Sequence, residues 1–247
     1  MGSERIMMLN VYVDNLSMEE TEDRIYDSIK NKYQIFHSGI NAVKVVDAQS
    51  DKAFREGMNE SDIINPDGQS VVWASRFLRT PLKERVPGIE LMERLVAKAQ
   101  EKKYTIYFLG ASEEVVSSLV KKYSEIYSPS IIAGYRNGYF SDKDEEEIVS
   151  DIVQSNANIL FVAITSPKKE IFLHTHRDAL RNVNLIMGVG GSFDVVAGKV
   201  KRAPVWMQKS GLEWFYRFLQ EPRRMWKRYL VGNTKFILLV LKERFTK

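Results

Sequence analysis

The feature that most limits the fold of this chain is the alternation of short apolar runs with amphipathic helical patterns along most of its length. Runs typical of strands cover residues 5–13, 33–36, 62–65, 105–109, 159–164 and 185–189. Helical patterns lie between them, including one over 41–58 and one that follows Ser17, with Glu20 three residues later as in a capping box. Strands that alternate with helices predict an α/β fold with a largely parallel sheet.

Several expected strands end in residues that form turns. Asn65 precedes Pro-Asp-Gly, Leu109 precedes Gly-Ala-Ser, Ile164 precedes Thr-Ser-Pro and Val189 precedes Gly-Gly-Ser. Open α/β sheets bind ligands outside the carboxyl ends of their parallel strands. We therefore expect these turns to gather around a binding site.

The composition of the chain changes near Ala203–Pro204, after which no strand pattern remains. From Lys199 to the end there are 13 Lys or Arg against three Glu and no Asp, and three of the four Trp lie there. We expect an α/β core over 1–203 and a helical appendage over 204–247. A basic, aromatic segment suits an anionic partner, whether a membrane, a nucleic acid or a phosphorylated substrate, although a solvated helical end explains the charge equally well.

Within the appendage, Pro222 is expected to end one helix and Arg223 to begin another. One side of that second helix carries Arg223, Arg224, Lys227 and Arg228, and roughly the opposite side carries Met225, Trp226, Tyr229 and Leu230. This pattern is typical of a helix at a membrane surface. The alternative is a helix packed on the core with its charged side in water, and an exposed apolar side would also permit self-association away from a membrane.

Composition also excludes several classes of protein. The chain has no cysteine, which rules out disulfides, zinc–thiolate sites and cysteine nucleophiles and fits a reducing cytoplasm. The N-terminal residues lack the apolar stretch of a signal peptide. The longest purely apolar run, 236–241, is far shorter than the roughly 20 residues that span a bilayer, so we expect no membrane-spanning segment.

The segment 188–194, GVGGSFD, follows an apolar run and opens an expected helix. Its glycines would let backbone N–H groups approach a phosphate or diphosphate closely, and tight strand-to-helix packing would explain them as well. The segment is not a dinucleotide-binding motif, because Phe193 stands where a third glycine or alanine is needed, and it has no Walker lysine.

Two other turns carry candidate catalytic groups. Asn65-Pro66-Asp67-Gly68 is first of all a turn sequence, but its place at a strand end makes Asp67 a candidate general base. Arg85 lies in a loop before a helix expected to begin near Ile89. Its guanidinium would hold phosphate oxygens bidentately, while an ordinary surface arginine is the alternative.

The segment 166–170, SPKKE, lies between an expected strand and a helix, where its serine and lysines would meet a nucleotide or its sugar. A helix N-cap followed by proline explains it equally well. His174 and His176 are two residues apart on an expected helix and therefore point to different faces. Asp142 and Asp144 begin an acidic run at a helix start, where negative charge suits the helix dipole. We therefore expect no metal site.

Together, six stretches of the chain resemble the WecG/TagA/CpsF family of glycosyltransferases, glycosyltransferase family 26. They are NPDGQSVV (65–72), RVPGIELM (85–92), YFLGAS (107–112), GYRNGYF (134–140), SPKKE (166–170) and the long block that begins with GVGGSFD and ends with WKRYL (188–230). They occur in the family's order across nearly the whole chain, and the last block is long and specific.

The resemblance implies a Rossmann-like core and an inverting transfer, without metal or cofactor, from a UDP-sugar to an undecaprenyl-diphosphate-linked sugar at the inner face of the cell membrane. The family's proposed catalytic base corresponds to Asp67, and its R-V-x-G arginine corresponds to Arg85. The other expected substrate-binding residues are Asn41, Gly88, Ser166, Lys169, Gly188, Gly190 and Gly191 in the core, with Arg217, Arg224 and Lys227 in the appendage. In the family, this appendage helps to complete the active site at the membrane.

Members of the family differ in donor sugar, which is N-acetylmannosamine for wall teichoic acid, N-acetylmannosaminuronate for enterobacterial common antigen, or glucose for exopolysaccharide. This chain has Lys169 where Gln is usual, Gly39 where teichoic-acid members have Thr, and Glu90 where Asp is frequent. The first two leave the donor open between these classes, and the lysine would favour a more anionic donor. The core has no recognisable nucleic-acid motif, so a non-enzymatic nucleic-acid-binding module is the distant alternative.

Overall fold

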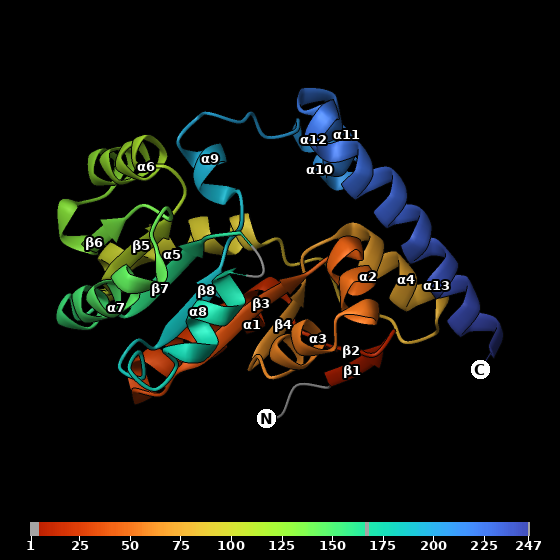
Figure 1. The fold of residues 1–247 in the computed structure, drawn as a ribbon, viewed down its shortest axis with the longest axis horizontal. Helices are drawn as coiled ribbons and strands as arrows, with labels where there is room; N and C mark the ends of the chain where they lie inside the picture. Colours follow the sequence, from red (N-terminus) through yellow and green to blue (C-terminus); the bar gives the residue numbers. More distant parts are fainter. Residues whose placement is uncertain (1–4, 166–167, 247) are drawn as a thin grey trace.

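A six-stranded parallel sheet forms the centre of the molecule (Figure 1). The computed structural model describes residues 5–165 and 168–246. The strands are β3 (Ile35–Ile40), β4 (Ile63–Pro66), β5 (Ile106–Gly110), β6 (Ile132–Arg136), β7 (Ile159–Ala163) and β8 (Leu185–Gly188), in the order β4-β3-β8-β7-β5-β6. All neighbouring strands in this sheet run parallel, which confirms the expected α/β fold with a Rossmann-like core.

Helices connect the strands and cover both faces of the sheet (Figure 1). They are α1 (Met18–Asn31), α2 (Ala42–Ser50), α3 (Lys52–Asn59), α4 (Gln69–Phe77), α5 (Gly88–Lys102), α6 (Glu113–Ile126), α7 (Glu145–Gln154), α8 (Lys168–Thr175) and α9 (Ser192–Val196). The expected capping box of α1 is confirmed, because the Ser17 hydroxyl accepts from the Glu20 N–H at 3.1 Å and the Glu20 carboxylate accepts from the Ser17 N–H at 2.8 Å. Both bonds satisfy donors that a helix start leaves without intrahelical partners.

The N-terminal run, expected as one strand, is a hairpin of β1 (Arg5–Met8) and β2 (Val11–Asp14). Leu9 and Asn10 have φ values of 51° and 60°, and two consecutive positive values are what a two-residue type I′ turn requires. The single-strand prediction was wrong because Leu-Asn is not the Asn-Gly or Asp-Gly sequence that usually marks such a turn.

The structure differs from the sequence-based expectation at two further places, each for a local reason. The helical pattern over 41–58 forms two helices, because Asp51 has extended backbone and its carboxylate caps α3 by accepting from the Phe54 N–H at 2.9 Å. The edge strand β6 had no recognised strand pattern, since its residues are only partly buried. Its Gly134 leaves room for the ring of Tyr107, whose nearest atom lies 2.6 Å from where a Cβ would be.

Three groups of buried apolar side chains hold these layers together. One packs one face of the sheet against α1, α5, α6 and α9, and another packs the opposite face against α7 and α8. The third joins β3 and β4 to the β1–β2 hairpin, α2 and α4. Strands β5 and β7 are covered on both faces, which explains why their sequences are almost continuously apolar.

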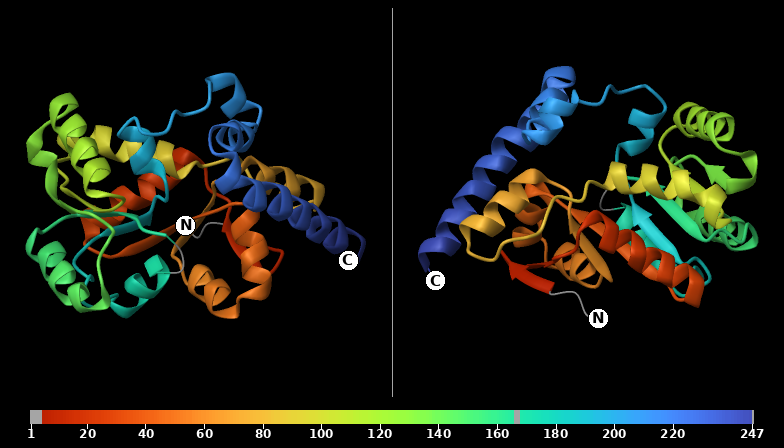
Figure 2. Two further views of the ribbon diagram at one scale, coloured as in Figure 1. Left: turned by 45° about the horizontal axis from the view of Figure 1, so that its top comes forward. Right: turned by 180° about the vertical axis from the view of Figure 1, so that it is seen from behind.

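After β8 the described chain contains no strand. Beyond α9, its elements are α10 (Val205–Lys209), α11 (Glu213–Gln220), α12 (Pro222–Trp226), a π-helical turn (Lys227–Val231) and α13 (Gly232–Thr246). Helix α13 runs along α2 and past α4 (Figures 1 and 2), and its Phe236 and Val240 belong to the third apolar group. None of the described helices is both long enough and apolar enough to cross a bilayer. The division of the chain at residue 203 stays a prediction.

Candidate functional site

A cleft of about 310 Å³ opens at the carboxyl ends of β3, β4 and β8. The turns after these strands and the loop 85–88 line one side, and residues between 211 and 233 from the C-terminal helices line the other. This is the edge at which open α/β sheets bind ligands. Of the turns expected to meet here, those after β4 and β8 do so, whereas the turns after β5 and β7 contribute no described residue to the lining.

Asp67 lines this cleft directly after β4. Its backbone is fixed, because its N–H and that of Gly68 both donate to the carbonyl of Ile40, at 2.9 and 3.2 Å. Its side-chain Oδ1 accepts a hydrogen bond of 2.8 Å from the N–H of Gly88. Among the described residues no donor contacts Oδ2, so that oxygen is available to take a proton from a ligand.

Arg85, which is 14% exposed, also lines the cleft. Its Nη1 lies 3.1 Å from Oε2 of Glu213 on α11, and its Nη2 lies 3.7 Å from Oε1 of Glu90 on α5. Arg202 pairs with the same two carboxylates. Arg85, Arg202, Glu90 and Glu213 therefore form a network of ion pairs at one edge of the cleft. The network links the loop before α5 to α5 and to α11.

The glycine turn after β8 lies against Arg217. Gly188 ends the strand, Gly190 has a φ of +52°, and α9 begins at Ser192, as the sequence predicted. A Cβ on Gly191 would lie 2.9 Å from Nη2 of Arg217, so the absence of a side chain lets the guanidinium rest on the turn. Backbone N–H groups beside an arginine form a suitable site for a phosphate.

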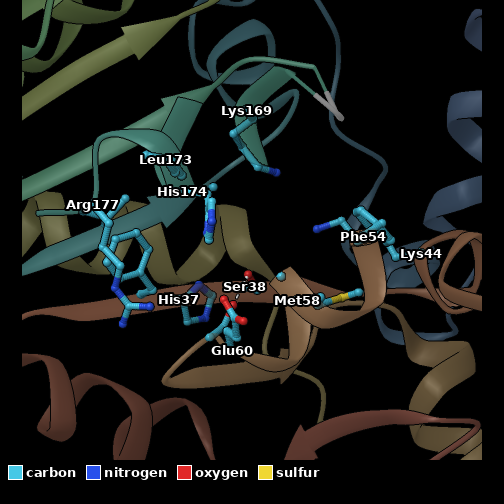
Figure 3. Close-up of a pocket in the computed structure, with 15 residues that line it drawn as sticks. His37, Ser38, Lys44, Phe54, Met58, Glu60, Lys169, Leu173, His174 and Arg177 are labelled. Carbon is cyan, nitrogen blue, oxygen red and sulfur yellow. Dashed lines mark hydrogen bonds between the residues drawn. The ribbon is translucent and has the colours of Figure 1, made fainter. Parts of the chain in front are cut away.

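The remaining predicted residues have different locations. Asn41 lines the cleft and caps α2, with its Oδ1 accepting from the Lys44 N–H at 3.2 Å. Lys169, on α8, does not line this cleft and instead lines a neighbouring cavity (Figure 3). Ser166 lies outside the described residues, as do the side chains of Arg224 and Lys227, so their roles stay predictions.

Behind the cleft, the buried His37 supports β4. Its Nε2 lies 2.7 Å from Oδ1 of Asn65, whose Nδ2 donates to Oγ1 of Thr21 at 3.1 Å. Burial lowers the pKa of His37 to about 4, so the imidazole is neutral at pH 7. No described residue partners its Nδ1. These contacts point to a structural role for His37.

The acidic run and His176 lie away from the cleft. His176 contacts Glu145 at 2.9 Å. Asp144 accepts from the backbone N–H and the hydroxyl of Ser141 at 2.7 and 2.8 Å, and these bonds lower the pKa of its carboxyl. Asp142 and Asp144 thus belong to a capped 3₁₀ turn before α7. Across residues 5–165 and 168–246, no group of three His, Asp or Glu side chains is placed to hold a metal ion.

The apolar side expected for the helix after Pro222 is divided between two environments. Met225 is 3% exposed and Tyr229 lines the cleft, whereas Trp226 and Leu230 are 52% and 54% exposed. One half of this apolar side therefore packs inward and the other half faces outward, and the interpretation of the helix as lying at a membrane surface stays a prediction.

Sequence reasoning missed four charged residues of the cleft, Lys44, Lys201, Arg202 and Glu213. Glu213 and Arg202 lie in the block 188–230, where we singled out the glycines and basic residues of the family pattern. Lys44 carried a usable signal, because a cation in the first turn of a helix opposes the helix dipole and needs another reason to be there.

Known proteins resemble this chain over most of its length. The family model described as "Glycosyl transferase WecG/TagA/CpsF family" matches residues 6–247. A relative from Bacillus subtilis (strain 168), named N-acetylglucosaminyldiphosphoundecaprenol N-acetyl-beta-D-mannosaminyltransferase, is 38% identical over 210 residues, which cover 85% of this chain and 80% of the relative.

Two more relatives have the same name. The protein from Bacillus spizizenii is 36% identical over 79% of this chain and 74% of its own length. The protein from Staphylococcus aureus (strain MW2) is 34% identical over 94% of this chain and 89% of its own length. The extent of these matches shows that the chain is a glycosyltransferase and belongs to the WecG/TagA/CpsF family.

Proposed function

We propose that this enzyme transfers a sugar of the N-acetylmannosamine type from a UDP-sugar to N-acetylglucosamine carried on undecaprenyl diphosphate, for teichoic acid or a related surface polysaccharide. The names of the relatives support this acceptor and this class of sugar. The observation that carries the proposal is the position of the Asp67 carboxylate, which lies in the same cleft as the glycine turn and Arg217.

The proposed reaction is a single displacement with inversion. Oδ2 of Asp67 takes the proton of an acceptor hydroxyl, and the hydroxyl oxygen attacks the anomeric carbon from the face opposite UDP. The bond between that carbon and the diphosphate oxygen breaks, and UDP leaves with the electron pair. Because the Gly88 N–H holds Oδ1, the carboxylate is oriented before the acceptor arrives.

Negative charge grows on the diphosphate as it leaves. We assign the stabilisation of this charge to Arg217 and to the backbone N–H groups of Gly190 and Gly191, which line the cleft, and Arg85 adds a second guanidinium. Donors that are fixed in advance stabilise developing charge without reorganising during the reaction. We infer that these groups replace a metal ion, so transfer should continue in EDTA.

We further propose that residues 204–247 hold the enzyme on the inner membrane surface, where the lipid-linked acceptor is found. The C-terminal helices expose Trp206, Leu219, Trp226, Leu230, Ile237, Leu238 and Phe245. Lys209, Arg223, Lys235 and Lys242 are exposed on the same helices. Apolar groups with adjacent cations suit the boundary between acyl chains and anionic headgroups.

The reaction is tested by measuring UDP release from a panel of UDP-sugars with a lipid-diphosphate-linked N-acetylglucosamine acceptor in the presence of EDTA. We expect release that depends on the acceptor and is confined to one class of donor. Release without acceptor would mean hydrolysis, and no release with any donor would contradict the proposed transfer.

Membrane binding is tested separately by co-sedimentation with phosphatidylglycerol vesicles and with DNA. The double variant Trp226→Ser, Leu230→Ser should lose vesicle binding while the fold persists, because both side chains are already exposed. Ile126→Ser, which removes an exposed apolar side chain from α6, is the control and should leave vesicle binding unchanged. Binding to DNA and not to vesicles would contradict the membrane role and favour the alternative of a nucleic-acid-binding module.

A further inference from the structure

The side chain of Trp73 belongs to the cleft, yet the reaction as proposed above gives it no role. Trp73 lies on α4, lines the cleft and is 50% exposed. A tryptophan of the core would be covered, and a tryptophan of the outer surface would not line a cleft at the carboxyl ends of the strands. An aromatic side chain that is half open inside a cleft offers an apolar face to a ligand.

The other tryptophan of the cleft already has aromatic neighbours. The ring centroid of Trp214, on α11, lies 5.7 Å from that of Phe215 and 5.8 Å from that of Tyr229. No aromatic ring or cation among the described residues packs on the ring of Trp73. Gly211, between α10 and α11, lies against its edge, because a Cβ on that glycine would be 2.8 Å from Cη2 of the indole. The exposed half of the Trp73 side chain is therefore available to a ligand.

Trp73 and the proposed base belong to one strand-to-helix connection. Asp67 directly follows β4 and α4 begins at Gln69, so Trp73 lies one helical turn, about 6 Å along the axis, beyond the start of the helix. Gln69 and Trp73 share a face of α4 because they are four residues apart. Gly211 lies against both side chains, since its Cβ would also be 2.9 Å from Cγ of Gln69. The spacing between the base and the indole is thus on the scale of a single sugar ring.

The order of the strands separates Trp73 from the glycine turn. β3 lies between β4, which leads to Asp67 and α4, and β8, which leads to the glycine turn and Arg217. Neighbouring strands are about 4.8 Å apart, so β4 and β8 are separated by roughly 10 Å. Helix α4 lies on the far side of β4 from β8 (Figure 1). Asp67 is therefore flanked by the glycine turn on one side and by Trp73 on the other.

This arrangement suits the acceptor. Inversion in one displacement requires the attacking hydroxyl and the leaving diphosphate on opposite faces of the transferred sugar. With the diphosphate at the glycine turn, the acceptor enters from the side of β4, where Trp73 lies. The connection that carries Gly211 follows α10, whose Val205 and Trp206 are exposed, and Trp206 belongs to the surface that we propose to lie on the membrane. A lipid-linked acceptor that reaches the cleft past α10 meets Trp73 first.

We propose that the indole of Trp73 stacks on the N-acetylglucosamine of the acceptor and so brings the acceptor hydroxyl to Asp67. This inference rests on the proposed function and gives its acceptor sugar a place in the cleft. One face of a pyranose ring carries mostly C–H bonds, whose slightly positive hydrogens suit the negative face of an aromatic ring. Trp73 is thus a binding residue for the acceptor, and the proton transfer stays with Asp67.

The test measures the binding of each substrate separately, by calorimetry on the full chain. The probes are UDP and an N-acetylglucosamine diphosphate that carries a short, water-soluble prenyl chain. Trp73→Ala should raise the Kd of the acceptor probe by about tenfold, which corresponds to roughly 1.4 kcal/mol, and should leave the Kd of UDP unchanged. Trp73→Phe, which keeps an aromatic face, should bind the acceptor probe within about threefold of the wild type. The KM for the acceptor in transfer assays should follow the same order.

Phe77→Ala is the matched control. Phe77 is an exposed aromatic residue one turn further along α4, it does not line the cleft, and the guanidinium carbon of Arg244 on α13 lies 6.0 Å from its ring centroid. The control removes a contact between α4 and the C-terminal helices without changing the cleft, so both dissociation constants should stay at their wild-type values. Thermal unfolding of each variant checks that the fold persists.

The outcomes separate this inference from the proposed function. Weaker binding of the acceptor probe to Trp73→Ala, together with no transfer by the wild type, would support the subsite and contradict the proposed reaction. Transfer by the wild type with an unchanged acceptor KM in Trp73→Ala would overturn the subsite and leave the reaction intact.

Three further results would also overturn the subsite. A loss confined to UDP binding would assign the indole to the donor. Equal losses for both probes, or a loss of acceptor binding in Phe77→Ala as large as in Trp73→Ala, would mean that Trp73 only supports the C-terminal helices. A wild type that does not bind the acceptor probe at all would leave the indole without its proposed ligand.

Discussion

The N–H of Gly88 donates a hydrogen bond of 2.8 Å to Oδ1 of Asp67 and joins two motifs that lie 21 residues apart. The same loop is also fixed by the N–H of Val86, which donates to the carbonyl of Pro66 at 2.9 Å. The proposed base and the loop that carries Arg85 therefore form one rigid unit at the end of β4. Because this support already holds the carboxylate in position, no free energy is spent on reorienting it during the reaction.

Asp67→Asn should keep the fold and lose the activity. The amide oxygen of asparagine can still accept from the Gly88 N–H, but the side chain cannot take a proton from the acceptor. Loss of a general base typically costs about 10² to 10⁴ in rate. UDP release and thermal unfolding measured on the same preparation check this, and wild-type turnover by the variant would exclude Asp67 as the base.

Glu213→Gln should lower kcat through Arg85. The substitution removes the charged partner at 3.1 Å, and a hydrogen bond to a charged group is worth about 1.5–3 kcal/mol, so we expect kcat to fall by about tenfold or more. In an Arg85→Ala background the same substitution should have almost no further effect, because the two residues act together.

The exposed Glu125→Gln serves as the control for charge alone. Additive losses in the double variant would show that Glu213 acts independently of Arg85.

Gly191→Ala should raise the KM for the donor with little loss of stability. The new methyl group would meet Nη2 of Arg217 at 2.9 Å, and the end of an arginine side chain can move aside. The guanidinium of Arg217 would then no longer lie against the glycine turn after β8, where we propose that the donor diphosphate binds. Donor titrations together with a thermal unfolding curve check this, and an unchanged KM would mean that Arg217 does not contact the donor from this position.

The stability of the protein should depend on pH through His37. Burial lowers its pKa in the folded protein to about 4, whereas the pKa in the unfolded chain is close to 6.5. As the pH falls below 6.5, the unfolded chain takes up a proton that the folded protein does not, so the free energy of unfolding decreases until about pH 4.

This decrease should total at most about 3.5 kcal/mol by pH 4, at roughly 1.4 kcal/mol for each unit of pKa difference. Urea unfolding near pH 7 and near pH 5 measures the first part of it, about 2 kcal/mol, for the wild type and for His37→Gln. The variant should show a smaller decrease, and an equal decrease in both proteins would assign the effect to the carboxylates.

Phe236→Ala should destabilise the whole protein. This side chain of α13 is 4% exposed and packs in the third apolar group with the core, so its removal should cost about 3–5 kcal/mol. Leu238→Ala, at a position that is 60% exposed, should change the free energy of unfolding by no more than about 0.5 kcal/mol. A separate early transition in the Phe236→Ala variant would instead support an appendage that unfolds independently of residues 1–203.

Several features of the fold were predictable because they depend on neighbouring residues. The apolar runs of β5 and β7 identify strands covered on both faces, and Ser17 with Glu20 marks the start of α1 through hydrogen bonds within one helical turn. The division of 41–58 at Asp51 is equally local and was missed because the helical periodicity continues across the break.

The sequence by itself determined the α/β class, the parallel sheet and the place of Asp67 at a strand end, since alternation and turn chemistry are properties of adjacent residues. Only the tertiary structure brought Arg85 to Glu213, 128 positions away, set Lys44 and Lys169 around one cavity, and packed Phe236 of α13 into the core. Contacts between residues so distant in the chain produce no periodic pattern in the sequence. They depend on the order of the strands, which decides which loops meet, and on which apolar helix faces the rest of the fold leaves exposed.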